Sequence, residues 1–239
     1  MLRTNLNFLS KDHNKPKKIL ITSTIKGEGK VFVSINWAIT LSSLNKKVIL
    51  VGADLRNPQL HKMLNVTRHK KGVTNYLYDE QTSIEDIIEE GQQYDLNFDL
   101  IFSGTIPPNP AELLSNGRLE GLLEELKKTY DYVLVDTAPT LLVTDTTLIT
   151  NLSDLIVFVI RANHTDKSLL HFINELQTLK KISNTGLVLN NVGEQQGYGY
   201  SYSYSYKYNY GYGYGYSADQ PSKKRKRNLW SMLVRKAKR

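Results

Sequence analysis

A lysine behind two closely spaced glycines is the feature of this sequence with the clearest chemistry. Gly27, Glu28, Gly29 and Lys30 lie in the segment ILITSTIKGEGKVF, in which an apolar run turns into a helix-like pattern. Glycine lets backbone N–H groups approach an anion closely. A lysine at a helix N-terminus adds positive charge where the helix dipole already favours a negative one. We therefore predict that residues 27–31 bind the phosphates of a nucleoside triphosphate.

This loop departs at two positions from the common phosphate-loop pattern GxxxxGK[ST]. Thr24 stands where the pattern begins with glycine, and Val31 stands where a hydroxyl would bind Mg²⁺. Valine has the shape of threonine but offers no oxygen to a metal. For GxGK alone, a tight strand-to-helix connection without a ligand is the alternative. The residues that follow in the chain weigh against it.

Two carboxylates follow apolar runs of the kind that form buried strands. Asp54 comes soon after Val48–Val51 and is followed by Arg56, whereas Asp136 directly ends Val133–Val135. The carboxyl ends of parallel strands meet at one edge of a sheet, where open α/β proteins bind their ligands. A lone Asp at a strand end is usually structural, but the repetition beside a phosphate loop makes coincidence improbable. The pattern therefore predicts Asp54 and Asp136 as ligands of Mg²⁺.

Predicted strands and helices alternate through residues 1–193, which indicates a three-layer α/β P-loop domain with a mostly parallel central sheet. The predicted strands are 19–21, 48–51, 98–102, 133–135, 155–160 and 186–190. The predicted helices are 33–45, 73–77, a helix beginning at Thr82 or Ser83 with Glu85 as its capping partner, 111–114, 118–130 and 167–181. Asn190 ends the last strand, where its amide could contact a nucleotide base. An Asn in a turn fits that position equally well.

A tyrosine-rich segment begins the remainder of the chain, over residues 194–220. Ten tyrosines occupy alternate positions, separated by Gly, Ser, one Lys and one Asn: Tyr198, Tyr200, Tyr202, Tyr204, Tyr206, Tyr208, Tyr210, Tyr212, Tyr214 and Tyr216. With Gly and Ser between the rings, the segment cannot bury a core, so we predict a disordered tail. One interpretation is a self-associating low-complexity linker. The other is a set of phosphate-accepting tyrosines, which phosphorylation would make strongly anionic.

The last segment, residues 221–239, concentrates the positive charge of the molecule. The formal net charge is +8, but nine of the 31 Lys and Arg follow Pro221 without an acid, so 22 bases and 23 acids precede them. Basic residues there flank an apolar cluster, as in a helix that lies on an anionic membrane surface; the cluster is Leu229, Trp230, Met232, Leu233 and Val234. Nucleic acid ranks last as a partner, because the preceding chain has no basic excess. No apolar run reaches 18 residues, so we expect no membrane-spanning segment, and the sequence has no cysteine.

Several of these motifs together resemble the bacterial tyrosine kinases (BY-kinases) of polysaccharide export. They are the phosphate loop, GADLRNP (52–58), IPPNPAELL (106–114), DYVLVDTAP (131–139) and the tyrosine tail, within about residues 2–216. The resemblance implies an ATP-dependent autokinase that phosphorylates its own tail tyrosines. It implies that Lys30 binds the β- and γ-phosphates, that Asp54 and Asp136 hold Mg²⁺, that Arg56 belongs to the second Walker motif, and that Asn190 faces adenine.

The resemblance also implies partners and a location. It places a kinase domain at the cytoplasmic face of the bacterial inner membrane, joined to a transmembrane chain-length regulator that is fused or separate. It implies a homo-oligomeric ring in which one subunit's tail reaches a neighbour's site, and a cognate tyrosine phosphatase. The segment LRTN resembles the end of the family's N-terminal contact helix, of which Arg3 remains. The implied role is to regulate polymerisation and export of a surface polysaccharide.

Two departures from the family pattern, and two alternatives, accompany this interpretation. Val31 lacks the hydroxyl ligand, and Gly52 stands where many members carry the first Asp of a DxD pair. We expect nucleotide binding to survive while Mg²⁺ affinity and transfer rate fall. One alternative is a pseudokinase, a nucleotide-sensing scaffold modified by another kinase. The other is a Min- or Par-like membrane ATPase, which is disfavoured because Ile25 occupies its signature lysine position.

Overall fold

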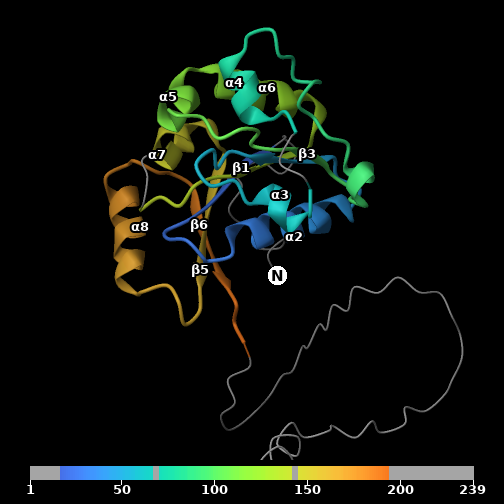
Figure 1. Cartoon of the computed structure of the whole chain (residues 1–239). Helices are drawn as coiled ribbons and strands as arrows, with labels where there is room; N and C mark the ends of the chain where they lie inside the picture. Colours follow the sequence, from blue (N-terminus) through green and yellow to red (C-terminus); the bar gives the residue numbers. More distant parts are fainter. Residues whose placement is uncertain (1–16, 67–69, 142–144, 194–239) are drawn as a thin grey trace, which may run out of the picture. The chain divides into compact units, whose positions relative to one another are not determined.

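The structure is a computed structural model that describes residues 17–66, 70–141 and 145–193 (Figure 1). The tyrosine-rich and basic segments predicted at the C-terminus lie outside the described residues. The strands are β1 (Lys17–Ser23), β2 (Val48–Gly52), β3 (Asp99–Ile101), β4 (Tyr132–Asp136), β5 (Leu155–Arg161) and β6 (Thr185–Asn190). The α-helices are α2 (Lys30–Ser42), α3 (Leu60–Met63), α4 (Val73–Tyr78), α5 (Pro110–Ser115), α6 (Arg118–Thr129), α7 (Asp145–Ile149) and α8 (Ser168–Thr178). Two short 3₁₀ helices cover Gly91–Tyr94 and Thr150–Leu152. None of these helices is long and apolar enough to cross a membrane.

The six strands form one sheet in the order β3-β2-β4-β1-β5-β6, and every strand pair is parallel. This confirms the predicted fold class. The strand that ends in Asp136 lies in the middle, where Asp136 pairs with Ile21 on one side and with Gly52 on the other. The register therefore brings the ends of β1, β2 and β4 to one edge of the sheet, as expected for adjacent parallel strands.

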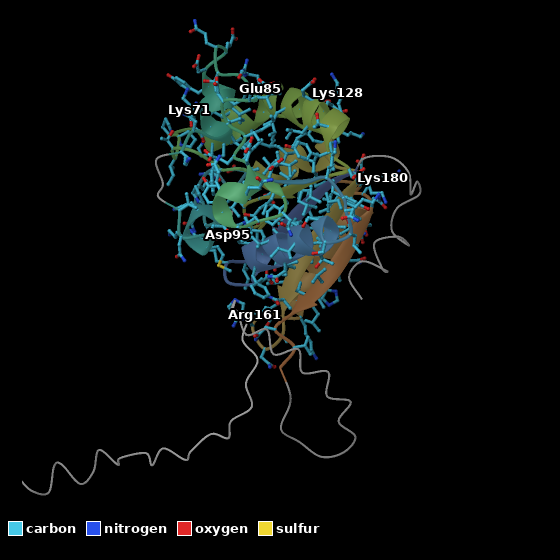
Figure 2. All side chains as sticks on the ribbon, turned by 90° about the vertical axis from the view of Figure 1, so that its right-hand side faces the viewer. Lys71, Glu85, Asp95, Lys128, Arg161 and Lys180 are labelled. Atoms are coloured by element: carbon cyan, nitrogen blue, oxygen red, sulfur yellow. The ribbon has the colours of Figure 1, made fainter. Side chains whose placement is uncertain are left out.

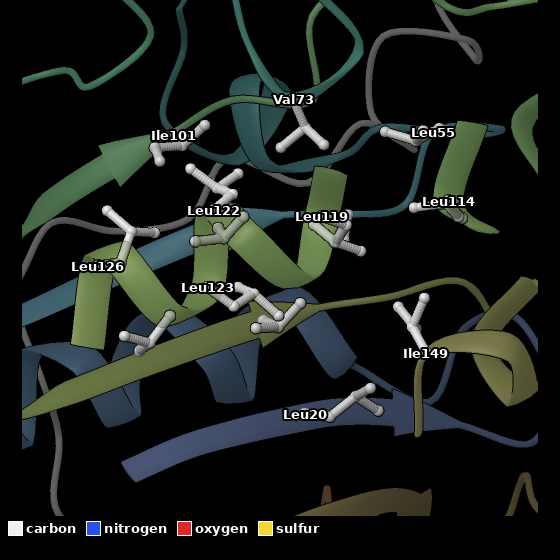
Figure 3. Packing of buried hydrophobic residues seen from close by; sticks show 14 of the residues in the cluster. Leu20, Leu55, Val73, Ile101, Leu114, Leu119, Leu122, Leu123, Leu126 and Ile149 are labelled. Atoms are coloured by element: carbon white, nitrogen blue, oxygen red, sulfur yellow. The ribbon is translucent and has the colours of Figure 1, made fainter. Parts of the chain in front are cut away.

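Helices cover both faces of the sheet and complete the three layers (Figure 1). On β1, Ile19 and Ile21 point to the face covered by α2 and α3, whereas Leu20 points to the face covered by α4 to α8. The second face contains the larger cluster, in which four leucines of α6, namely Leu119, Leu122, Leu123 and Leu126, pack over the sheet (Figure 3). Strands buried on both faces account for the continuous apolar runs in the sequence.

The helix predicted from Thr82 or Ser83 to residue 90 is wrong. Ser83 N–H donates to Asp86 Oδ2 at 3.0 Å and Asp86 N–H donates to Ser83 Oγ at 3.3 Å, so the reciprocal capping bonds form, with Asp86 in place of Glu85. The chain then extends, and Glu89 forms an isolated antiparallel bridge with Leu100 of β3. Burial of Ile87 in the larger core cluster favours this path over a continued helix.

Candidate functional site

The candidate site lies at the carboxyl edge of the sheet, where β1 leads into the predicted phosphate loop. The ends of β2, β4, β5 and β6 surround that loop. Arg161, the last residue of β5, is at the end of the molecule opposite to Glu85 and Lys128 (Figure 2). Side chains at or just beyond the ends of these four strands therefore lie around the loop.

The phosphate loop needs glycine at two positions because of its backbone conformation. Gly27 has φ +85° and Gly29 has φ +90°, a region that residues with a Cβ rarely adopt. A Cβ at Gly29 would also lie 2.1 Å from Asn190 Nδ2, so the Asn190 side chain would have to move away from the loop. Directly after Gly29, α2 begins with Lys30, so the loop ends at a helix N-terminus as predicted.

A buried carboxylate holds the loop from inside. Glu28 is 1 % exposed, and its carboxylate accepts the hydroxyl of Thr24 at 3.0 and 3.1 Å and the N–H of Ile25 at 2.9 Å. The hydroxyl of Thr165, from the loop after β5, donates to the same carboxylate. The threonine that departs from the GxxxxGK pattern is thus the hydrogen-bond partner of Glu28. At this position the conformational freedom of glycine is replaced by a side-chain hydrogen bond that fixes the loop.

A second set of contacts holds three successive loop carbonyls from outside. Arg161 Nη1 donates to the carbonyl of Gly27 at 2.9 Å, and Asn190 Nδ2 donates to that of Glu28 at 2.9 Å. His164 Nε2 lies 3.0 Å from the carbonyl of Lys26. In a trans peptide the C=O and the following N–H point in opposite directions, and no described peptide is cis. Because these three carbonyls are held on one side of the loop, the N–H groups of residues 27–29 point to the opposite side, as an anion site requires.

The lysine and the two predicted metal ligands lie together. Lys30 Nζ is 3.1 Å from Asp136 Oδ1 and 3.7 Å from Asp54 Oδ2, and all three side chains are buried. The Ser34 hydroxyl lies 3.0 Å from the carbonyl of Lys30 and 3.4 Å from Asp136 Oδ1. Burial raises the pKa of Asp136 although Lys30 opposes the shift. Among the residues that the structure describes, Lys30 is the one cation within ion-pair distance of either acid.

Residues after β2 form a fixed turn. Asp54 Oδ1 accepts the N–H of Asn57 at 3.0 Å, so only its other oxygen faces Lys30. Arg56 makes a two-pronged ion pair with buried Asp145, at 2.6 Å from Nε to Oδ2 and 3.0 Å from Nη2 to Oδ1. This hydrogen-bonded pair raises the pKa of Arg56. The segment that contains Arg56 is therefore tied to the start of α7.

Gly52, where the family pattern often carries an acid, is packed closely against Ser103 in this chain. A Cβ at Gly52 would lie 2.9 Å from Ser103 Oγ and 3.2 Å from Ser103 N. Ser103 follows β3, the neighbour of β2, and is itself buried. The absence of a carboxylate here is therefore matched by the packing around it.

The loop opens into a cavity of about 620 Å³. Its lining comprises Ser23, Lys26, Gly27, Glu28, Gly29, Lys30, Val31, Phe32, Asp54, Arg56, Asn57, Gln59, Met63, Ala138 and Pro139. The loop and Lys30 suit a polyphosphate. Among the described residues no group of three or more His, Cys, Asp or Glu could hold a metal alone. Mg²⁺ needs only one or two carboxylates beside phosphates and water, so Asp54 and Asp136 fit it.

The structure brings together most of the predicted site residues, and it adds others. Asn190 does not line the cavity but lies against the loop, where its amide donates to a carbonyl. The adenine contact therefore stays a prediction. The sequence analysis named Thr24 only as a departure from the loop pattern, and it missed Ser34, Asp145, Arg161, His164 and Thr165. The spacing of Thr24 four residues before Glu28 could have indicated their pairing. The others depend on contacts far apart in the chain.

Comparison with known proteins shows the family to which the chain belongs. Residues 16–189 match the AAA domain family. The tyrosine-protein kinase YwqD of Bacillus subtilis is 35% identical over 189 residues, which cover 79% of this chain and 78% of YwqD. The chain belongs to the bacterial tyrosine kinase family. CpsD of Streptococcus agalactiae, also named a tyrosine-protein kinase, is 33% identical over 193 residues, or 81% of each protein.

Solved structures of this family confirm the predicted fold. The kinase domain of Escherichia coli tyrosine kinase ETK superposes with a TM-score of 0.74 and 31% identity, over 86% of this chain and 78% of ETK. The septum site-determining protein MinD of Pyrococcus horikoshii, complexed with Mg-ADP, has a TM-score of 0.61 at 22% identity, over 76% and 72%. The MinD likeness concerns the fold alone. The family assignment therefore comes from the kinases.

Proposed function

We propose that this BY-kinase family member transfers the γ-phosphoryl group of ATP to tyrosines of its own C-terminal segment. The observation that carries the proposal is Lys30, held at the head of a rigid phosphate loop between Asp54 and Asp136. Relatives that are 35% and 33% identical over the aligned residues are named tyrosine-protein kinases. The chain itself supplies a candidate substrate in the ten alternating tyrosines of residues 198–216.

The site residues have separate tasks in this reaction. The N–H groups of residues 27–29 bind the phosphate oxygens, and Lys30 exchanges its contact with Asp136 for the β- and γ-phosphates. Asp54 and Asp136 would hold Mg²⁺, which neutralises charge on the phosphates when bound. Val31 offers no ligand, so water would take that coordination place.

Phosphoryl transfer then proceeds in line. The tyrosine hydroxyl oxygen forms a bond to the γ-phosphorus, and the bond from that phosphorus to the bridging oxygen breaks, so the electron pair leaves with ADP. A loose transition state can form without a strong general base, although a base still speeds the transfer. Because Gly52 provides no carboxylate, the phenolic proton is released to solvent. We expect slow transfer as a result, since positioning and charge neutralisation remain but the base is missing.

We further propose transfer in trans, within a homo-oligomeric ring at the cytoplasmic face of the bacterial inner membrane. The partners would be a transmembrane chain-length regulator, an anionic membrane surface under the basic segment, and a cognate tyrosine phosphatase. The output would be control of capsular or exopolysaccharide polymerisation and export. A putative tyrosine-protein kinase in the cps region of Klebsiella pneumoniae, 35% identical over 192 residues, supports this context; the match covers 80% of this chain and 26% of that protein.

Transfer in trans is testable by mixing two variants. A Lys30→Met chain keeps its tail but lacks the catalytic lysine, and a chain that lacks residues 197–217 keeps the site but not the tyrosines. Each is incubated alone and together with Mg²⁺ and ATP. The proposal predicts phosphotyrosine only in the mixture and only on the Lys30→Met chain. Phosphotyrosine in the full chain but never in the mixture would restrict transfer to one molecule.

A second candidate function, a pseudokinase scaffold, is favoured by one observation. Val31 and Gly52 both lack groups that phosphoryl transfer uses, and Ser103 occupies the space beside Gly52. In that case the protein binds ATP, and another kinase modifies its tail. Phosphotyrosine that persists on a Lys30→Met chain isolated from its native host would favour the scaffold. Its loss would favour the autokinase.

A further inference from the structure

The mouth of the cavity carries two apolar side chains that the fold does not need. Phe32 in the first turn of α2 is 51% exposed, and Met63 at the end of α3 is 49% exposed. Both line the cavity, and α2 and α3 lie against each other (Figure 1). We call this pair the acceptor rim.

Core packing does not explain the exposure of Phe32. One and two turns further along the same face of α2, Asn36 and Thr40 are exposed and polar, whereas the buried face carries Val33 and Trp37. An amphipathic helix has no structural reason for a phenylalanine on its outer face. On α3, Leu60 supplies the buried contact and Met63 points outward. Exposed apolar side chains that gather at the mouth of a polar cavity are typical of a binding site.

The chemistry of the rim fits the side chain of the acceptor rather than the phosphates of the donor. The loop, Lys30 and Asp54 form the polar part of the cavity, whereas a phenylalanine and a methionine offer ring-edge and sulfur contacts to an aromatic ring. A tyrosine holds its hydroxyl at the far end of such a ring. It can place that oxygen near the γ-phosphate while its backbone stays outside.

We propose that the acceptor rim receives the ring of the incoming tyrosine and thereby selects tyrosine over serine. This proposal rests on the proposed kinase function. A serine hydroxyl lies one carbon from the backbone, so a serine would have to bring its main chain beneath Phe32 and Met63, where the N–H and C=O would lose water. The tail contains both kinds of residue side by side, with Ser201, Ser203 and Ser205 between its tyrosines.

The test uses the full chain and a labelled synthetic peptide of residues 197–210. The variants are Phe32→Ala, Met63→Ala and the double variant, with Phe32→Leu and Met63→Leu as conservative replacements. Asn36→Ala, on the same helix face but outside the cavity lining, is the matched control. Peptide affinity is measured by fluorescence anisotropy with a non-hydrolysable ATP analogue bound, and peptide phosphorylation is measured separately with ATP.

The double variant is expected to raise the peptide Kd and KM on the order of tenfold, because apolar contact with the ring is lost. The leucine replacements should recover most of that affinity, and Asn36→Ala should change nothing. Mass spectrometry should show phosphate on tyrosines and none on the three serines in the wild type. A rise in the KM for ATP without a rise for the peptide would overturn the proposal, because the rim would then contact the nucleotide.

The two measurements separate this proposal from the function on which it rests. If the wild-type chain phosphorylates the peptide and the double variant does so equally well, the rim proposal fails and the kinase function stands. If the wild type binds the peptide through the rim but transfers no phosphate, the kinase function fails and the rim stands as a tyrosine-binding surface. If the peptide neither binds nor is phosphorylated, both fail.

Discussion

The buried carboxylate of Glu28 should determine both the stability of the domain and its affinity for ATP. It accepts hydrogen bonds from Thr24, Ile25 and Thr165, which belong to the start of the loop and to the segment after β5. Glu28→Ala removes the acceptor of all three donors and leaves the part-buried N–H of Ile25 without this partner. The two hydroxyls can rotate toward other acceptors, but the backbone N–H of Ile25 cannot.

The expected cost follows from this difference. Net contributions of hydrogen bonds to a charged group are about 1.5–3 kcal/mol each, and partial rearrangement reduces their sum, so we expect Glu28→Ala to lower the free energy of unfolding by about 3 kcal/mol. Glu28→Gln keeps the shape and one acceptor oxygen and should cost about 1 kcal/mol. Because the loop is no longer held before the ligand arrives, the ATP Kd of Glu28→Ala should rise about tenfold.

The assay is urea unfolding followed by far-UV circular dichroism, together with titration of a fluorescent ATP analogue. Glu125→Ala is the matched control, since Glu125 pairs with Lys128 at 2.6 Å on the exposed face of α6. Exposed pairs contribute little, so this variant should remain within about 0.5 kcal/mol of wild type. A Glu28→Ala chain as stable as the control, with unchanged ATP affinity, would refute the role assigned to this carboxylate.

Three further predictions concern the loop and its metal site. Val31→Thr restores a hydroxyl ligand and should lower several-fold the Mg²⁺ concentration needed for half-maximal transfer; an unchanged requirement would contradict the reasoning. Lys30→Met leaves the buried acids unpaired and should cost about 3 kcal/mol near neutral pH. Burial raises the folded-state pKa of Asp136 above its unfolded value, so its contribution to stability is present at low pH and is lost as pH rises through the folded-state pKa. The destabilisation by Lys30→Met should therefore shrink as the pH is lowered from neutral, and a destabilisation that does not change with pH would contradict this cause. Gly29→Ala places a Cβ 2.1 Å from a side-chain nitrogen of β6 and should raise the ATP Kd more than tenfold, whereas Gly121→Ala, with nothing within 4 Å, should not.

The sequence predicted the site best where the local residue pattern and the topology of a parallel sheet lead to the same placement. Lys30, Asp54 and Asp136 could be predicted to meet because each follows an apolar run, and parallel strands end at one edge of a sheet. The helix after Ser83 was wrong because the capping signal is local, whereas the path of that segment is set by a bridge to β3. Capping bonds alone do not extend a helix when a buried neighbour favours extended backbone.

The contacts that hold the loop were beyond prediction from pattern alone. Arg161 and His164 reach loop carbonyls more than 130 residues away in the chain, and neither position belongs to a phosphate-loop motif. Such contacts depend on the final placement of β5 against β1. By contrast, the pair of Thr24 and Glu28 is local. Its spacing could have been recognised as the reason why a threonine replaces the first glycine.

Phosphotyrosine on the purified chain tests the central claim most directly. The protein is dephosphorylated, incubated with Mg²⁺ and ATP, and examined by mass spectrometry beside Lys30→Met and a chain lacking residues 197–217. The account predicts new phosphate on tyrosines between 198 and 216, absent from both variants. A wild-type chain that binds ATP but gains no phosphotyrosine would contradict it, because the loop and Lys30 would then hold a nucleotide without transferring its phosphate.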